Sequence, residues 1–81
     1  MSRPTPTEAD RLELVARASA ELARAQAAAS AGDWRLLADA LKRFVAILRT
    51  FEAAGFGDGS EFDAPLRAVA RRARVTSRSA T

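Results

Sequence analysis

The chain lacks several residue types on which catalysis and metal binding usually depend. Its 81 residues include no cysteine, no histidine and no tyrosine. Without cysteine there can be no disulfide and no thiolate metal site. Without histidine the chain also lacks the commonest general base and the commonest zinc ligand. We therefore expect a protein that is not an enzyme and that holds no metal and no cofactor.

Long apolar segments are also missing. No uninterrupted apolar run approaches the ~18 residues that a membrane-spanning helix needs, and the first residues lack the pattern of a signal peptide. We expect a cytoplasmic protein with no membrane partner. A chain of this length forms one small domain, in which apolar burial only narrowly exceeds the loss of chain entropy.

The chain has a net formal charge of +3, and its charged residues are unevenly distributed along the sequence. Residues 1–65 carry eight basic and ten acidic side chains, whereas residues 66–81 carry five arginines and no acid. A solvated face near a helix C-terminus explains such arginines most simply. A phosphate-binding patch is the alternative, although no interleaved aromatic residue is available for base stacking. The residues of this candidate basic patch are Arg67, Arg71, Arg74 and Arg78.

The segment Ala31-Gly32-Asp33-Trp34 separates two long helical patterns. Gly32 can end a helix in the left-handed conformation without a Cβ penalty. Asp33 can then cap the next helix through its side chain. Because the stop and the start are so close, the second helix must fold back on the first. The sequence therefore predicts an antiparallel helical hairpin.

The first helix is predicted over residues 6–31, after a disordered lead at residues 1–5. Thr5 is the expected N-cap, Pro6 the first helical residue and Glu8 the end of a capping box. The helix has an apolar stripe that is rich in alanine and a charged face that we expect to be solvated. The stripe contains Leu12, Val15, Leu22 and Ala29, and the charged face contains Asp10, Glu13, Arg17, Glu21 and Arg24.

The second helix is predicted over residues 34–54 and has the strongest apolar pattern. Its apolar arc covers about 200°, nearly twice what one partner helix needs. We therefore expect this helix to be the central element, covered from two sides, with Leu41, Phe44 and Leu48 at the centre of the core. Its heptad-like stripe is Trp34, Leu37, Leu41, Phe44, Leu48 and Phe51.

A glycine-rich loop at residues 56–60 precedes a third helix, predicted over residues 63–75 with Asp63 as its N-cap and Pro65 in its first turn. Residues 77–81 are predicted to be a frayed tail. The oxygen-rich run from Asp58 to Asp63 lacks the spacing of a calcium loop and fits a turn and a cap. The fold class is all-α: an antiparallel hairpin plus a short third helix, forming a three-helix bundle in one domain over residues 6–76.

The third helix has too few large apolar side chains to cover the second helix fully. At ~25 cal/mol per Å², several wet Leu and Phe side chains would forfeit several kcal/mol. We therefore expect a client protein or a second copy of the chain to cover this surface. Trp34 has two interpretations, as a residue of the core or hairpin corner and as an interface anchor. The candidate partner-binding residues are Trp34, Leu36, Ile47, Phe51, Leu66 and Val69.

The stretch from Ala25 to Leu37, followed by Arg43 and Leu48, resembles the core of FliT-type flagellar export chaperones. In that family a similar turn joins an alanine-bearing helix to a leucine-rich helix with basic residues. The resemblance covers about 30 residues around the Gly32-Asp33-Trp34 turn. It implies a helical-bundle chaperone that shields an amphipathic helix of an exported flagellar subunit, with the C-terminal helix competing for the client groove.

Two functional hypotheses follow. The first is a protein-binding module, chaperone-like or regulatory, that takes an amphipathic helix into a groove beside the second helix. The second is a small self-associating protein, regulatory or of phage type, forming a homodimer whose arginine-rich C-terminal segment contacts nucleic acid or an acidic partner.

Overall fold

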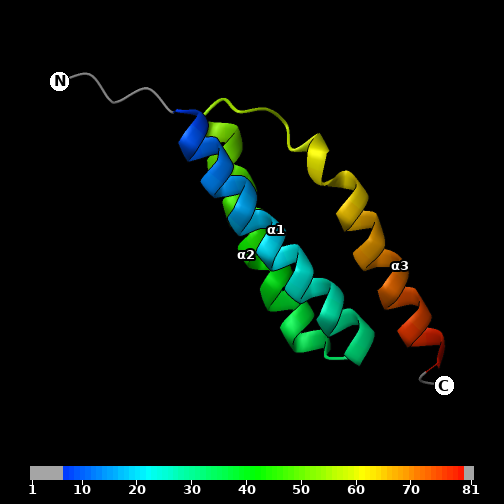
Figure 1. The fold of residues 1–81 in the computed structure, drawn as a ribbon. Helices are drawn as coiled ribbons and strands as arrows, with labels where there is room; N and C mark the ends of the chain where they lie inside the picture. The colour runs from blue at the N-terminus through cyan, green and yellow to red at the C-terminus, as the bar shows by residue number, and fades with distance from the viewer. Residues whose placement is uncertain (1–6, 80–81) are drawn as a thin grey trace.

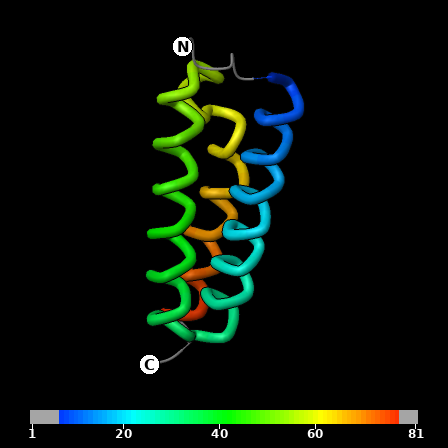
Figure 2. The backbone as a smooth tube through the Cα atoms, turned by 90° about the vertical axis from the view of Figure 1, so that its left-hand side faces the viewer, coloured from blue at the N-terminus to red at the C-terminus, as the bar shows by residue number. Residues whose placement is uncertain are grey.

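Three helices form an up-down-up bundle in the computed structural model, which describes residues 7–79 (Figure 1). The helices are α1 (Glu8–Ala31), α2 (Trp34–Ala53) and α3 (Asp63–Ser79), and the short 3-10 helix η1 (Ser60–Phe62) leads directly into α3. The described part of the chain contains no strand, so the predicted all-α class is confirmed. Figure 2 shows α1 and α3 running in one direction and α2 in the other. The predicted lead at residues 1–5 lies outside the described residues, as do residues 80–81.

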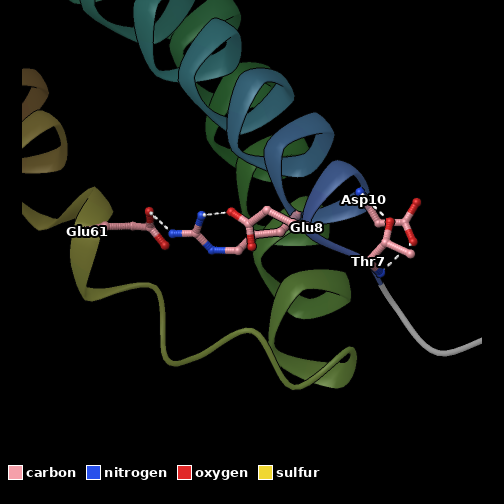
Figure 3. A network of polar contacts seen from close by, with 5 residues as sticks. Thr7, Glu8, Asp10 and Glu61 are labelled. Atoms are coloured by element: carbon pink, nitrogen blue, oxygen red, sulfur yellow. Dashed lines mark hydrogen bonds and ion pairs between the residues drawn. The ribbon is translucent and has the colours of Figure 1, made fainter.

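The helix α1 begins two residues later than predicted. Its N-cap is Thr7, whose hydroxyl accepts a hydrogen bond from the Asp10 backbone N–H at 3.2 Å, while the Asp10 carboxylate accepts one from the Thr7 N–H at 3.0 Å (Figure 3). This is a complete capping box, so the prediction of Thr5 and Glu8 for these roles is wrong. The two candidate boxes are two residues apart in the sequence, and local pattern alone does not rank them.

The turn between α1 and α2 has the predicted chemistry. Gly32 has a φ of 73° in the left-handed region, and the Asp33 N–H donates to the Ala28 carbonyl at 2.9 Å. The Asp33 carboxylate accepts a hydrogen bond from the Leu36 N–H at 3.1 Å, which caps α2. One residue therefore ends α1 and the next one starts α2, which confirms the hairpin.

The central helix is α1, and the prediction that the second helix would be central is wrong. α1 packs against both α2 and α3, whereas the backbones of α2 and α3 lie farther from each other. Small side chains explain this arrangement, because they let two neighbouring backbones come near the same helix. The prediction gave weight to the large side chains of α2 and too little to the small ones of α1. The buried residues of α1 are Ala18, Leu22, Ala25, Ala28 and Ala29.

The buried face of α1 is also rotated from the predicted stripe. Leu12, expected in the stripe, is 56% exposed. Glu21, expected on the solvated face, has a side chain that is only 13% exposed, with its Oε1 3.6 Å from the Arg24 guanidinium. The other carboxylate oxygen of Glu21 is buried and has no hydrogen-bond partner within the described part of the chain. Leu22 and Ala29 of the predicted stripe are buried, so the buried face overlaps the stripe but is turned toward Ala18, Ala25 and Ala28.

Aromatic rings hold the end of the bundle where α2, η1 and the start of α3 meet. Phe62 packs edge-on against Phe44 and Phe51, with ring centroids 5.5 and 5.8 Å apart. Phe51 also contacts Phe56, so all four phenylalanines of the chain are linked. The prediction of the core centre is correct for Phe44, which is buried, whereas Leu41 and Leu48 are half-buried at its edge.

α3 begins at Asp63 as predicted, but its N-cap and its end differ from the prediction. Asp63 has helical backbone angles, φ −61° and ψ −44°, and is not the N-cap, because η1 runs into α3 without a break. The preceding turn is closed instead by Asp58, whose carboxylate accepts a hydrogen bond from the Ser60 N–H at 3.0 Å. At the other end α3 continues to Ser79, so residues 77–79 are helical and not a frayed tail.

An ion pair links the start of α1 to η1. Arg11 donates to Glu8 at 2.9 Å and to Glu61 at 3.4 Å (Figure 3 labels both glutamates). These side chains are partly exposed, so the pair contributes little free energy. The Arg11–Glu61 contact shows that η1 lies beside the start of α1.

Candidate protein-interaction surface

One side of α2 keeps large apolar side chains in contact with solvent. Trp34 and Val45 are 45% and 43% exposed, and Leu41 between them is half-buried. They follow the spacing i, i+7 and i+11, which places them along one line of the helix. We name this surface the α2 strip, and its residues are Trp34, Leu37, Ala38, Leu41 and Val45.

Two open hollows lie along the α2 strip. The first, of about 560 Å³, lies between the start of α2 and the end of α3 and is lined by Trp34, Leu37, Ala73, Arg74 and Ser77. The second, of about 400 Å³, lies on α2 alone and is lined by Ala38, Leu41, Lys42, Val45, Ala46 and Arg49. The first exists because α3 packs on α1 and leaves this side of α2 uncovered. Both hollows combine apolar side chains of α2 with basic side chains.

Both margins of the α2 strip are basic. Lys42 and Arg49 lie on its outer margin, and Arg74 of α3 lies on the other. All three side chains are exposed, and none takes part in an ion pair within 4.0 Å among the described residues. Unpaired like charges on both sides of an apolar surface favour a partner with carboxylates beside its apolar face.

The predicted partner-binding residues separate into three groups. Trp34 and Leu36 are exposed, at 45% and 42%, which excludes the core interpretation of Trp34. Leu36 lies about 160° around α2 from Trp34, so the two cannot bind one helix together. Ile47 and Leu66 are half-buried against the core. Phe51 and Val69 are buried inside the bundle, where no partner reaches them in this fold.

The middle of the α2 strip was not among the predicted binding residues. The sequence shows Leu37 and Leu41 as core positions of a heptad stripe, and Val45 as its widened margin. In the structure Leu37 and Leu41 are half-buried against a cluster that includes Val69 of α3, and Val45 is 43% exposed. The signal that could have found them was the width of the apolar arc, which exceeds what one partner helix buries.

The predicted basic patch is a second surface, on the outer side of α3. Arg67, Arg71 and Arg74 are exposed and lie together around Ala70. The backbone of Arg78 continues the same helix, but its side chain lies outside the described residues. The patch therefore shares Arg74 with the margin of the α2 strip and otherwise faces away from it.

The loop before η1 behaves as a turn and a cap. The exposed Asp58 carboxylate accepts hydrogen bonds from the Ser60 backbone N–H and, with a smaller effect, from the Ser60 hydroxyl. These bonds hold the pKa of Asp58 below its ordinary value of 3.8. Among residues 7–79 no group of three or more carboxylates is placed to hold a metal ion. The carboxylate of Asp58 is used in closing the turn.

Comparison with protein-family models, with curated proteins and with solved structures finds no match to this chain. No helix within residues 7–79 is long and apolar enough to cross a membrane.

Proposed function

We propose that the chain is a non-catalytic protein-binding module that packs an amphipathic helix of a client protein on the α2 strip. The exposure of Trp34 and Val45 on one line of α2 carries this proposal. An amphipathic helix would seat its apolar face along this line and bury both side chains. The α2 strip spans about 16 Å between these residues, which is about three turns of a partner helix.

The client helix carries acidic residues beside its apolar face in this proposal. Lys42, Arg49 and Arg74 line both margins and form no ion pair within 4.0 Å among residues 7–79, so carboxylates of a client would pair with them. A second copy of the chain is disfavoured for the same reason. In a two-fold dimer through this surface the basic margins of the two copies would meet.

The resemblance around Gly32-Asp33-Trp34 supports a chaperone of the flagellar export type as the biological setting. In that setting the client is an exported subunit and the complex forms in the cytoplasm. The family would make α3 a competitor for the client, and its position beside the first hollow is compatible with that role.

A model peptide tests the proposal directly. Trp34 is the only tryptophan of the chain, so its fluorescence reports on the α2 strip without a label. An 18-residue amphipathic peptide with a leucine face and glutamate margins should shift the emission to the blue as Trp34 loses water. The same peptide with lysine margins should bind at least tenfold more weakly.

Matched variants locate the binding. Val45→Asp should weaken the glutamate peptide at least tenfold, whereas Leu12→Asp, at a residue 56% exposed on α1, should leave its affinity unchanged. Equal binding of both peptides, or equal binding by both variants, would contradict the proposal. Sedimentation of the free protein as a stable dimer that Val45→Asp dissociates would make the second copy, not a client, the occupant.

A further inference from the structure

The outer side of α3 carries a line of arginines that the bundle does not use. Arg67, Arg71 and Arg74 lie about 140–160° around the helix from Val69, the buried residue by which α3 faces the core. In Figure 1, α3 lies at the edge of the molecule. We name these three residues the arginine line. Its members are exposed and share one surface with Ala70.

The arginines of α1, unlike the arginine line, form ion pairs within their own helix. Arg11, Arg17 and Arg24 each have a glutamate one turn earlier, at 2.9, 2.7 and 3.6 Å. No acidic residue follows Asp63 in the sequence, and no residue of the arginine line forms an ion pair within 4.0 Å among the described residues. Like charges three and four residues apart on a helix destabilise it. The bundle therefore bears a cost that an external polyanion would offset.

We propose that the arginine line binds the phosphate backbone of a double-stranded nucleic acid without reading its sequence. Guanidinium groups bind phosphate oxygens in a bidentate manner. The three arginines extend over about 10.5 Å of the helix axis, and duplex DNA presents one phosphate per ~1.7 Å of its own axis. Ala70 between them is small and lets the helix come close to a backbone.

The composition of the arginine line favours this ligand over other anionic partners. A protein interface has an apolar or aromatic centre, and the line offers only Ala70 there. Binding to a membrane surface needs a broad apolar face beside the basic one. Binding to single strands depends on aromatic stacking, and α3 contains no aromatic residue. Contacts to the backbone of a duplex need only the charges.

The test is fluorescence anisotropy of a labelled 20-base-pair DNA duplex at several salt concentrations. The triple variant R67Q/R71Q/R74Q should lose at least tenfold in affinity at low salt. The control R17Q/R35Q/R43Q, which removes the same charge from exposed positions of α1 and α2, should lose less than threefold. The slope of log K against log salt should fall by about 2.7 in the triple variant, about 0.9 for each phosphate contact removed.

Competitors and a second variant make the outcome decisive. Polyglutamate or a single strand that displaces the duplex as well as unlabelled duplex does would overturn the assignment. Absence of duplex binding at low salt, or equal losses in the triple variant and its control, would also overturn it. Far-UV circular dichroism checks folding, and R71Q alone, with an expected two- to fivefold loss, replaces the triple variant if that unfolds. The Val45→Asp variant should bind the duplex with unchanged affinity, because Val45 lies on the α2 strip and not on the arginine line. Duplex binding and client binding are therefore tested by different variants.

Discussion

Gly59 shows how much a single backbone position decides in this bundle. It is buried, has a φ of 78° and immediately precedes η1. A Cβ atom at this position would collide with the Leu48 side chain of α2. The left-handed backbone of Gly59 and its approach to Leu48 both favour a residue without a side chain at this turn.

Gly59→Ala should destabilise the protein more than Gly55→Ala does. Both glycines have a φ near 80°, but a Cβ atom on Gly55 would have no atom within 4 Å. Left-handed backbone strain should cost about 1–2 kcal/mol in each variant, and the displacement of Leu48 should add about 1–3 kcal/mol in Gly59→Ala. Urea unfolding followed by circular dichroism measures both. Equal free energies of unfolding would show that Leu48 moves aside freely.

At the scale of the helices, the alanines of α1 set the architecture. Ala18, Ala25 and Ala29 are fully buried, and α2 and α3 both pack on this helix. Ala25 belongs to a cluster with Ala40 of α2 and Val69 of α3, so it lies where all three helices meet. A larger side chain there cannot be accommodated without moving a helix.

Ala25→Leu should therefore lower the free energy of unfolding by about 1–3 kcal/mol, the usual cost of overpacking a core. Ala27→Leu is the matched control, because Ala27 is exposed on the same helix and its replacement should change stability by less than ~0.5 kcal/mol. Thermal melts of the two variants give the comparison. A melting temperature of Ala25→Leu equal to that of Ala27→Leu would contradict the central place of α1.

At the scale of the whole molecule, exposed apolar surface and unpaired positive charge occur together. The α2 strip has basic margins, and the arginine line continues positive charge over α3. Repulsion between these charges opposes self-association through the α2 strip, while the apolar surface favours it. The balance between the two should depend on salt.

We expect the protein to be monomeric at 0.1 M salt and to self-associate at 1 M salt. The screening length falls from about 10 Å to about 3 Å over this range, whereas apolar attraction is not screened. Sedimentation velocity at the two salt concentrations measures the change, and Val45→Asp should suppress it. A dimer that forms at low salt and dissociates at high salt would show that ion pairs, not the α2 strip, hold the copies together.

Local chemistry was sufficient to predict the elements and the hairpin. Gly32 and Asp33 stop one helix and start the next through bonds that reach at most five residues, so the sequence alone located that turn. The exposed basic patch was found for a similar reason, since one helix period places Arg67, Arg71 and Arg74 together. The N-caps of α1 and α3 were misplaced, because several neighbouring residues can cap equally well.

Only the tertiary structure decided which helices and side chains pack against one another. Phe62, which lies between the predicted loop and the predicted third helix, packs in the core just after the turn at Gly59. The exposure of Trp34 and Val45 depends on α3 packing on α1 rather than on α2. The sequence pattern shows that a helix has a wide apolar face, since that property is local. Which part of the face stays open depends on how closely each pair of helices can approach, and that is settled by small side chains distant in the sequence.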